Sequence, residues 1–144
     1  MIRLVTDSMA QLPAEIVRQY NIAIVPVCVI FNGKPYREGI DITNEEFYRR
    51  LAATDTLPTT TQPSPGDFQQ VYQRLADEGA DIISIHPPET LSGTINSARQ
   101  AAALVEGVRI TPVEVPWIAP AQGFIVVEAA RAIEAGADYD EVLK

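Results

Sequence analysis

The sequence predicts an α/β fold, in which a mostly parallel sheet has helices on both faces and carries a small β-hairpin insertion. Short apolar runs such as Ile2–Val5 and Ile82–His86 have the length and composition of buried strands. Segments with apolar residues at helical spacing alternate with these runs, as expected for right-handed βαβ crossovers. The pair Asn32-Gly33 stands between two further strand-like runs, and it supplies the positive φ angles that a tight hairpin turn needs.

The first part of the chain is expected to form two strands with a helix between them, followed by the hairpin. The helix should start at Pro13, because proline is favoured at the first helical position. The second strand is Ile22–Val27, in which Pro26 indicates a sheet edge or a bend. The two strands of the hairpin are Val29–Phe31 and Lys34–Arg37.

Two helix starts can be recognised in the middle of the chain. Thr43 and Glu46 have the spacing of a capping box, and the helix that they open should run to about Ala53. Ser64-Pro65 places an N-cap residue before a proline at the first helical position, which predicts the start of another helix. Between these helices, Thr54–Gln62 is expected to be a polar loop.

The last part of the chain continues the alternation. A helix is expected over Leu91–Val105, a strand over Arg109–Val115 and a second helix over Gln122–Ala135. A proline-bounded apolar loop, Pro116–Pro120, precedes that second helix, and Asp138–Lys144 looks like the start of one more. Ligands of parallel sheets bind at the carboxyl ends of the strands, so the site is expected at that edge.

Composition and charge argue against several classes of function. The net charge is −8 and the only lysines are Lys34 and Lys144, so neither a nucleic-acid footprint nor a surface for anionic membranes is indicated. Cys28 is the only cysteine and His86 the only histidine, which excludes an intrachain disulfide and cysteine or multi-histidine metal sites. No metal and no cofactor are expected.

The length of 144 residues fits one domain with a hydrophobic core. The N-terminus enters a strand directly, without a signal-peptide pattern, and no apolar stretch is long enough to span a bilayer. A cytoplasmic protein is therefore expected. The nucleophile elbow, the P-loop and the dinucleotide-binding glycine motif are all missing, so the sequence favours a binding protein over an enzyme.

The best candidate for a ligand site is the junction that follows the Ile82–His86 strand, where Ser92, Gly93 and Thr94 lie near the start of a helix. A helix start leaves backbone N–H groups without partners and carries the positive end of the helix dipole. Such a junction suits a carboxylate or a phosphate. The alternative is that Ser92 or Thr94 only caps the helix.

A second hydroxyl-rich stretch is Thr59-Thr60-Thr61, which is followed by Pro63 and Pro65. The prolines restrict the residues before them to extended conformations, so the stretch is stiff. Extended threonines can present hydroxyl groups to a ligand without adding charge. The alternative is a solvated linker that caps the next helix.

Three motifs in this order, Thr6-Asp7-Ser8, Thr59–Ser64 and Leu91–Thr94, resemble the DegV family of bacterial fatty-acid-binding proteins. The resemblance runs from Met1 to about Val142. It implies that the chain is a single N-terminal α/β domain of a two-domain family, with the second domain absent. It also implies a long-chain fatty acid as ligand, which some members present to a separate fatty acid kinase.

Carried over by motif, the resemblance assigns the hydroxyls that hold the carboxylate to Thr61 and Ser92. Gly93 would offer its backbone N–H, and Thr94 would support the site. Neutral donors of this kind can hold an anion without a buried lysine, because each charge-assisted hydrogen bond contributes roughly 1.5–3 kcal/mol.

The sequence departs from the family pattern at the carboxyl ends of the strands. Pro87-Pro88-Glu89 replaces a hydroxyl-rich run, and Trp117 and Ala119 replace serines. An alternative hypothesis is therefore a shortened or engineered DegV-type scaffold that binds a protein partner, or forms a homodimer, through an apolar patch. The residues expected in this patch are Pro87, Pro88, Trp117, Ile118 and Pro120. A third hypothesis is a hydrolase with Ser92 as nucleophile and His86 as base.

Overall fold

A computed structural model describes residues 1–144, which form a large parallel sheet and a small antiparallel one. The strand order of the large sheet is β2-β1-β6-β7, and all neighbours are parallel. This arrangement confirms the predicted fold class. The strands of the large sheet are β1 (Ile2–Asp7), β2 (Ala23–Val25), β6 (Asp81–His86) and β7 (Ile110–Glu114).

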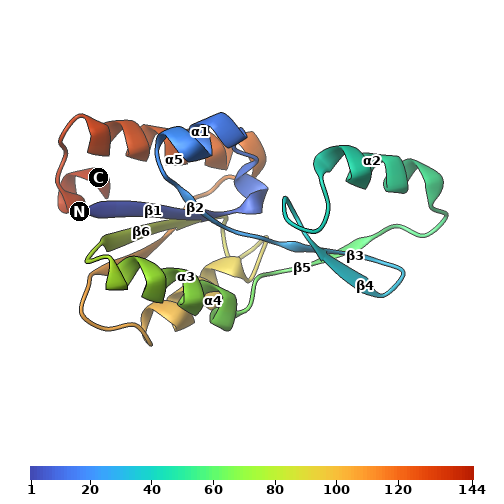
Figure 1. The fold of residues 1–144 in the computed structure, drawn as a ribbon, viewed down its shortest axis with the longest axis horizontal. Coiled ribbons are helices and arrows are strands. Elements are labelled where there is room, and N and C mark those ends of the chain that lie inside the picture. Colours follow the sequence, from blue (N-terminus) through green and yellow to red (C-terminus); the bar gives the residue numbers. More distant parts are fainter.

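Helices cover both faces of the large sheet, as predicted (Figure 1). One face packs against α3 (Pro65–Asp77) and α4 (Thr94–Ala102), whose apolar side chains share a core with β1, β2 and β6. The other face packs against α5 (Ala119–Glu134), with α1 (Ala14–Gln19) and α6 (Tyr139–Val142) beside it. None of these helices combines the length and the apolar composition that a bilayer crossing requires.

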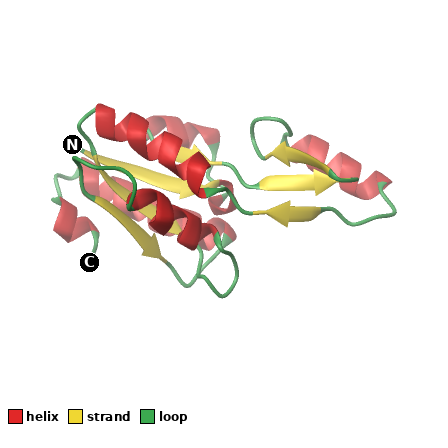
Figure 2. Cartoon of the chain, turned by 90° about the horizontal axis from the view of Figure 1, so that it is seen from below, coloured by secondary structure: helices red, strands yellow, loops and turns green.

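The small sheet has the order β4-β3-β5 and lies beyond the carboxyl edge of the large sheet (Figure 2). Together with α2 it forms the part that we call the small lobe, residues 28–61. The predicted hairpin is confirmed, because Asn32 and Gly33 join β3 to β4 with positive φ angles of 49° and 77°. The elements of the lobe are β3 (Cys28–Phe31), β4 (Lys34–Arg37), α2 (Asn44–Ala53) and β5 (Thr59–Thr61).

The prediction of a polar loop over Thr54–Gln62 is wrong in part, because this stretch contains β5. The strand pairs antiparallel with β3, with Thr61 opposite Cys28. All three threonines are exposed, so no alternation of apolar and polar residues marked the strand in the sequence. Threonine is nevertheless β-branched and favours strands wherever a partner edge is offered, and β3 offers one.

Three helix starts differ by a few residues from those predicted. Helix α4 begins at Thr94 and not at Leu91, whose side chain is 65% exposed in the turn before it. Helix α5 begins at Ala119, because Pro120 is accepted in its first turn. Pro13 is the N-cap of α1 and not its first residue.

Two chain segments join the small lobe to the rest of the molecule. One runs from β2 to β3 through Pro26 and Val27, and the other runs from β5 to α3 through residues 62–64. The Ser8 hydroxyl accepts a hydrogen bond from the Val27 N–H at 2.9 Å and donates one to Glu38 of the lobe at 2.7 Å. Figure 1 shows the lobe projecting from the carboxyl edge of the large sheet.

Helix α5 approaches the short 3-10 turn Ser8–Ala10, which follows β1, so closely that Gly123 has no room for a side chain. A Cβ atom there would lie 2.5 Å from the backbone oxygen of Ala10. We expect Gly123→Ala to lower the free energy of unfolding by about 1–3 kcal/mol, because the backbone must shift. Chemical denaturation measures this change.

The matched control is Gly66→Ala, also within a helix, where the added Cβ would meet only the Ser64 hydroxyl oxygen at 3.6 Å. This variant should be as stable as the parent, or more stable by up to about 1 kcal/mol. Equal effects of the two substitutions would contradict the close approach at Gly123.

Candidate functional site

The start of α4 and the turn before it place hydroxyl and N–H groups at the carboxyl edge of the large sheet, where Ser92 is half-buried and Thr94, the first residue of the helix, is fully buried. The hydroxyl oxygens of Ser92 and Thr94 are 2.8 Å apart, and the Thr94 N–H donates to the Ser92 hydroxyl at 3.3 Å. The N–H groups of Gly93 and Ile95 have no hydrogen-bond acceptor, and Gly93 is an N-cap without a side-chain cap. The start of α4 therefore keeps the free donors that an anion site needs.

The stretch that contains Thr61 touches this turn. Gln62 donates from Nε2 to the Ser97 hydroxyl at 3.3 Å, and its side chain lies against Gly93. A Cβ atom on Gly93 would be 2.1 Å from Gln62 Oε1, so a side chain at this position would displace the Gln62 carboxamide. Thr61 is exposed, and its hydroxyl makes a single, long hydrogen bond of 3.5 Å to the backbone carbonyl oxygen of Gln62. Both hydroxyl-rich stretches of the sequence thus reach the same edge, and the ligand role of their residues stays a prediction.

The loop between β6 and α4 is fixed by a charged network. The Glu89 N–H donates to Glu114 at 2.9 Å, and Arg99 bonds to both carboxylates, at 2.9 Å to Glu114 and 3.4 Å to Glu89. The Glu89 N–H, followed by the Arg99 guanidinium, lowers the pKa of Glu114 below its ordinary value. Asn96 also donates to Glu89 at 2.8 Å. Glu89, which departs from the family pattern, therefore helps to anchor the loop that carries Ser92, together with Glu114 and Arg99.

A buried chain of hydrogen bonds crosses the end of the large sheet beside this site. Tyr72 donates to the Ser84 hydroxyl at 2.7 Å, Ser84 lies 2.6 Å from His86 Nε2, and His86 Nδ1 lies 2.7 Å from Asp7 Oδ2. Because Ser84 accepts from Tyr72, its own hydrogen is free for Nε2. The ring hydrogen of His86 then sits on Nδ1 and points to the carboxylate. All four groups are paired, as buried polar groups must be.

Gln122 joins this network from the first turn of α5, and the sequence interpretation missed its role. Its Nε2 donates to the Thr6 hydroxyl at 3.0 Å and to Asp7 at 3.2 Å, and the residue is fully buried. The signal available in the sequence was a glutamine at the start of an otherwise strongly apolar helix. Gln62 was missed in the same way, because it was treated only as the end of a polar loop.

The hydrolase hypothesis is wrong in its geometry. Both ring nitrogens of His86 are used by Ser84 and Asp7, and the side chain is fully buried. The Ser92 hydroxyl pairs with Thr94. The Ser92–His86 pair that this mechanism needs is therefore not formed.

The apolar patch of the alternative hypothesis is only partly assembled. Trp117 is 57% and Ile118 46% exposed, and Pro120 is exposed next to them. Pro87 is buried and Pro88 half-buried, so the expected single patch is wrong at these two positions. They follow the buried strand β6, and the Pro88 carbonyl accepts the hydrogen bonds that shape the next turn.

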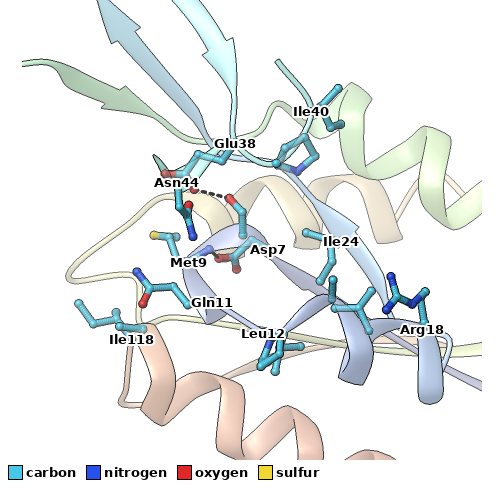
Figure 3. Close-up of a pocket in the computed structure, with 17 residues that line it drawn as sticks. Asp7, Met9, Gln11, Leu12, Arg18, Ile24, Glu38, Ile40, Asn44 and Ile118 are labelled. Carbon is cyan, nitrogen blue, oxygen red and sulfur yellow. Dashed lines mark hydrogen bonds between the residues drawn. The ribbon is translucent and has the colours of Figure 1, made fainter. Parts of the chain in front are cut away.

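A cavity of about 780 Å³ opens on the α1 side of the same edge (Figure 3). Asp7 and Ser8 line it from the large sheet, and Glu38 lines it from the small lobe. None of the four predicted ligand residues, Thr61, Ser92, Gly93 and Thr94, belongs to its lining. Its apolar wall includes Leu12, Val17, Ile24, Ile40 and Ile118.

Comparison with known proteins decides the family. The family described as "Uncharacterised protein, DegV family" matches residues 1–144. The chain belongs to the DegV family. A DegV domain-containing protein of Listeria innocua is 45% identical over 138 residues, which are 96% of this chain and 49% of that protein. One of Lactococcus lactis is 42% identical over 99% of this chain and 51% of its own length.

Solved DegV structures share the fold. DegV of Bacillus subtilis, described as a fatty acid binding protein, superposes with a TM-score of 0.93 at 34% identity. A DegV family protein of Thermus thermophilus, described by its fatty acid binding, gives 0.89 at 35% identity. Each comparison covers 99% of this chain and 50–51% of the other. This chain therefore spans about half the length of the DegV proteins it matches.

The resemblance stated from the sequence motifs is thus confirmed. No group of three or more His, Cys, Asp or Glu side chains in the structure is arranged to hold a metal ion. What the relatives bind is known for those proteins, and its transfer to this chain is a proposal.

The buried network generates a prediction on pH. Burial raises the pKa of the Tyr72 hydroxyl above its ordinary value of 10.0. Above about pH 10 the unfolded chain loses this proton while the folded one keeps it, so stability falls as the pH rises. Tyr72→Phe should make this fall shallower in urea denaturation from pH 9 to 11. Tyr139, whose pKa burial also raises, leaves part of the fall in place.

Tyr48→Phe is the control, because Tyr48 is 63% exposed on α2. It should leave the pH profile unchanged. An identical profile for Tyr72→Phe and the parent would contradict a proton held by the buried network.

Proposed function

We propose that this DegV protein binds a long-chain fatty acid and holds its carboxylate between Thr61 and the turn of Ser92, Gly93 and Thr94. The observation that carries the proposal is the contact of Gln62 with Gly93, which brings the strand of Thr61 against a helix start with free N–H groups. Two hydroxyls from separate stretches and amides without acceptors suit one negative headgroup. The fatty-acid binding described for the Bacillus and Thermus proteins supports the same ligand.

Electrostatics at this turn favour an anion although no lysine is close in the sequence. The positive end of the α4 dipole lies at Gly93, and the first turn of the helix contains no acidic residue. Glu89 of the preceding loop and Glu114 at the end of β7 are both paired with Arg99. A bound carboxylate would therefore lie next to hydrogen-bond donors and not next to unpaired acidic side chains.

The acyl chain needs apolar surface, because each buried CH₂ contributes about 0.8 kcal/mol. Leu91, directly before Ser92, is 65% exposed, and Trp117 and Ile118 are exposed on the loop that follows β7. These side chains lie at the same carboxyl edge as the hydroxyls. We assign them to acyl-chain contact and not to a protein partner or a homodimer.

The proposal treats the protein as a carrier and not as an enzyme. Residues 1–144 would form the single N-terminal α/β domain that provides the headgroup half of the DegV site. A separate fatty acid kinase would take the ligand from it, because the carboxylate would lie at an exposed edge. A cytoplasmic location is part of this proposal, since such a kinase needs ATP.

The test removes one hydroxyl at a time. Thr61→Val and Ser92→Ala should each weaken fatty-acid binding about ten- to 150-fold, the equivalent of one charge-assisted hydrogen bond. Titration with a fluorescent fatty acid measures the affinity, and mass spectrometry of extracted lipid shows what co-purifies.

Thr60→Val is the matched control, because neighbouring residues of a strand point to opposite faces. It should bind like the parent. Unchanged affinity in both Thr61→Val and Ser92→Ala, or a parent protein that binds no fatty acid, would overturn the proposal.

A further inference from the structure

Gln62 connects the two parts of the molecule that contribute to the proposed site. We infer that Gln62 is a positioning residue, which ties the strand of Thr61 to the start of α4 and sets the spacing of the carboxylate donors. The inference rests on the proposed function and adds a residue to its site. It explains why a glutamine side chain lies across the turn that carries Ser92.

The two halves of the site belong to different bodies. Thr61 is the last residue of β5 in the small lobe, whereas Ser92 and Gly93 precede a helix packed on the large sheet. Two short segments join the lobe to the rest, and Figure 1 shows no helix of the large sheet covering it. The separation of Thr61 from Ser92 therefore depends on the few contacts that cross between the bodies.

On the α4 side, the contact is made by Gln62, the first residue of the segment that joins β5 to α3. Its Nε2 donates at 3.3 Å to the hydroxyl of Ser97, which is 2% exposed and lies one turn into α4. The other crossing contact, from Ser8 to Glu38, lies at the large cavity. Removal of the Gln62 amide would leave the Thr61 side of the lobe without a side-chain hydrogen bond to α4.

The carboxamide also lies over the backbone of the predicted anion site. A Cβ atom on Gly93 would be 2.1 Å from Gln62 Oε1 and 2.7 Å from both Cδ and Nε2. Such contact places a neutral amide, and not a charge, beside the backbone of Gly93. The dipole of α4 then remains available to the ligand.

A charged side chain at position 62 provides a test that separates a role at the headgroup from a purely structural role. Gln62→Glu keeps the size of the side chain but sets a negative charge beside the carboxylate, so fatty-acid affinity should fall about tenfold or more at pH 7.5. Binding of the fatty alcohol of equal chain length should change far less, because its headgroup is neutral. Equal losses for acid and alcohol would overturn the inference.

Gln70→Glu is the matched control, since Gln70 is exposed on α3 and makes no side-chain hydrogen bond. It introduces the same charge away from the turn, and fatty-acid affinity should stay within about twofold of the parent. A loss as large as that of Gln62→Glu would show a general charge effect and would also overturn the inference.

A double-mutant cycle tests the contact itself. Gly93→Ala should push the Gln62 side chain off Ser97 and weaken fatty-acid binding, with little change in the denaturation midpoint, because only a flexible side chain must move. In a Gln62→Ala background the same substitution should have no further effect on affinity. Additive losses of affinity would contradict the inference that a side chain at position 93 weakens binding by displacing Gln62.

The outcomes separate this inference from the proposed function. A parent protein that binds no fatty acid refutes the function. A parent that binds, with Gln62→Glu and Gln62→Ala binding equally well, refutes only the positioning role.

Discussion

The close approach of the Gln62 side chain to the Gly93 backbone is the constraint on which the proposed site depends. It joins a small antiparallel lobe to the start of a helix on a parallel sheet, at a point where neither body alone offers a complete set of donors. The absence of a Cβ atom at Gly93 allows the approach, and the hydrogen bond to Ser97 holds it. Hydroxyls that are far apart in sequence are thereby brought to one edge.

The buried polar network gives that edge its rigidity. The two central strands end in this network. Asp7 is the last residue of β1, His86 is the last residue of β6, and Ser84 lies two residues before it. Two further side chains, Tyr72 and Gln122, enter from helices on opposite faces of the sheet. In a low-dielectric interior such a network favours one arrangement, because each broken bond leaves a further unpaired polar group beside the Gln122 Oε1, which has no partner. The network therefore fixes the strand ends from which the loops of the site start, although none of its members is proposed to touch the ligand.

The sequence was sufficient for the architecture, because buried strands and amphipathic helices leave regular apolar patterns. It was not sufficient for β5, whose exposed threonines carry no such pattern and pair only because β3 presents an edge. Leu91 matches the apolar spacing of α4 but lies before the first residue of the helix. Its N–H and that of Ser92 donate to the Pro88 carbonyl, which closes a separate turn. Ser92 and Thr61 could be singled out by chemistry and motif. Gln62 and Gln122 could not, because their roles depend on contacts between segments distant in the chain.

A crystal structure of the protein with a bound long-chain fatty acid tests the central claim most directly. The account predicts carboxylate oxygens within about 2.7–3.2 Å of both the Thr61 and Ser92 hydroxyls, and of the Gly93 N–H. The Gln62 amide should still bond to Ser97. A headgroup bound to Arg18 of α1, which lines the large cavity, with Thr61 and Ser92 facing solvent, would contradict it.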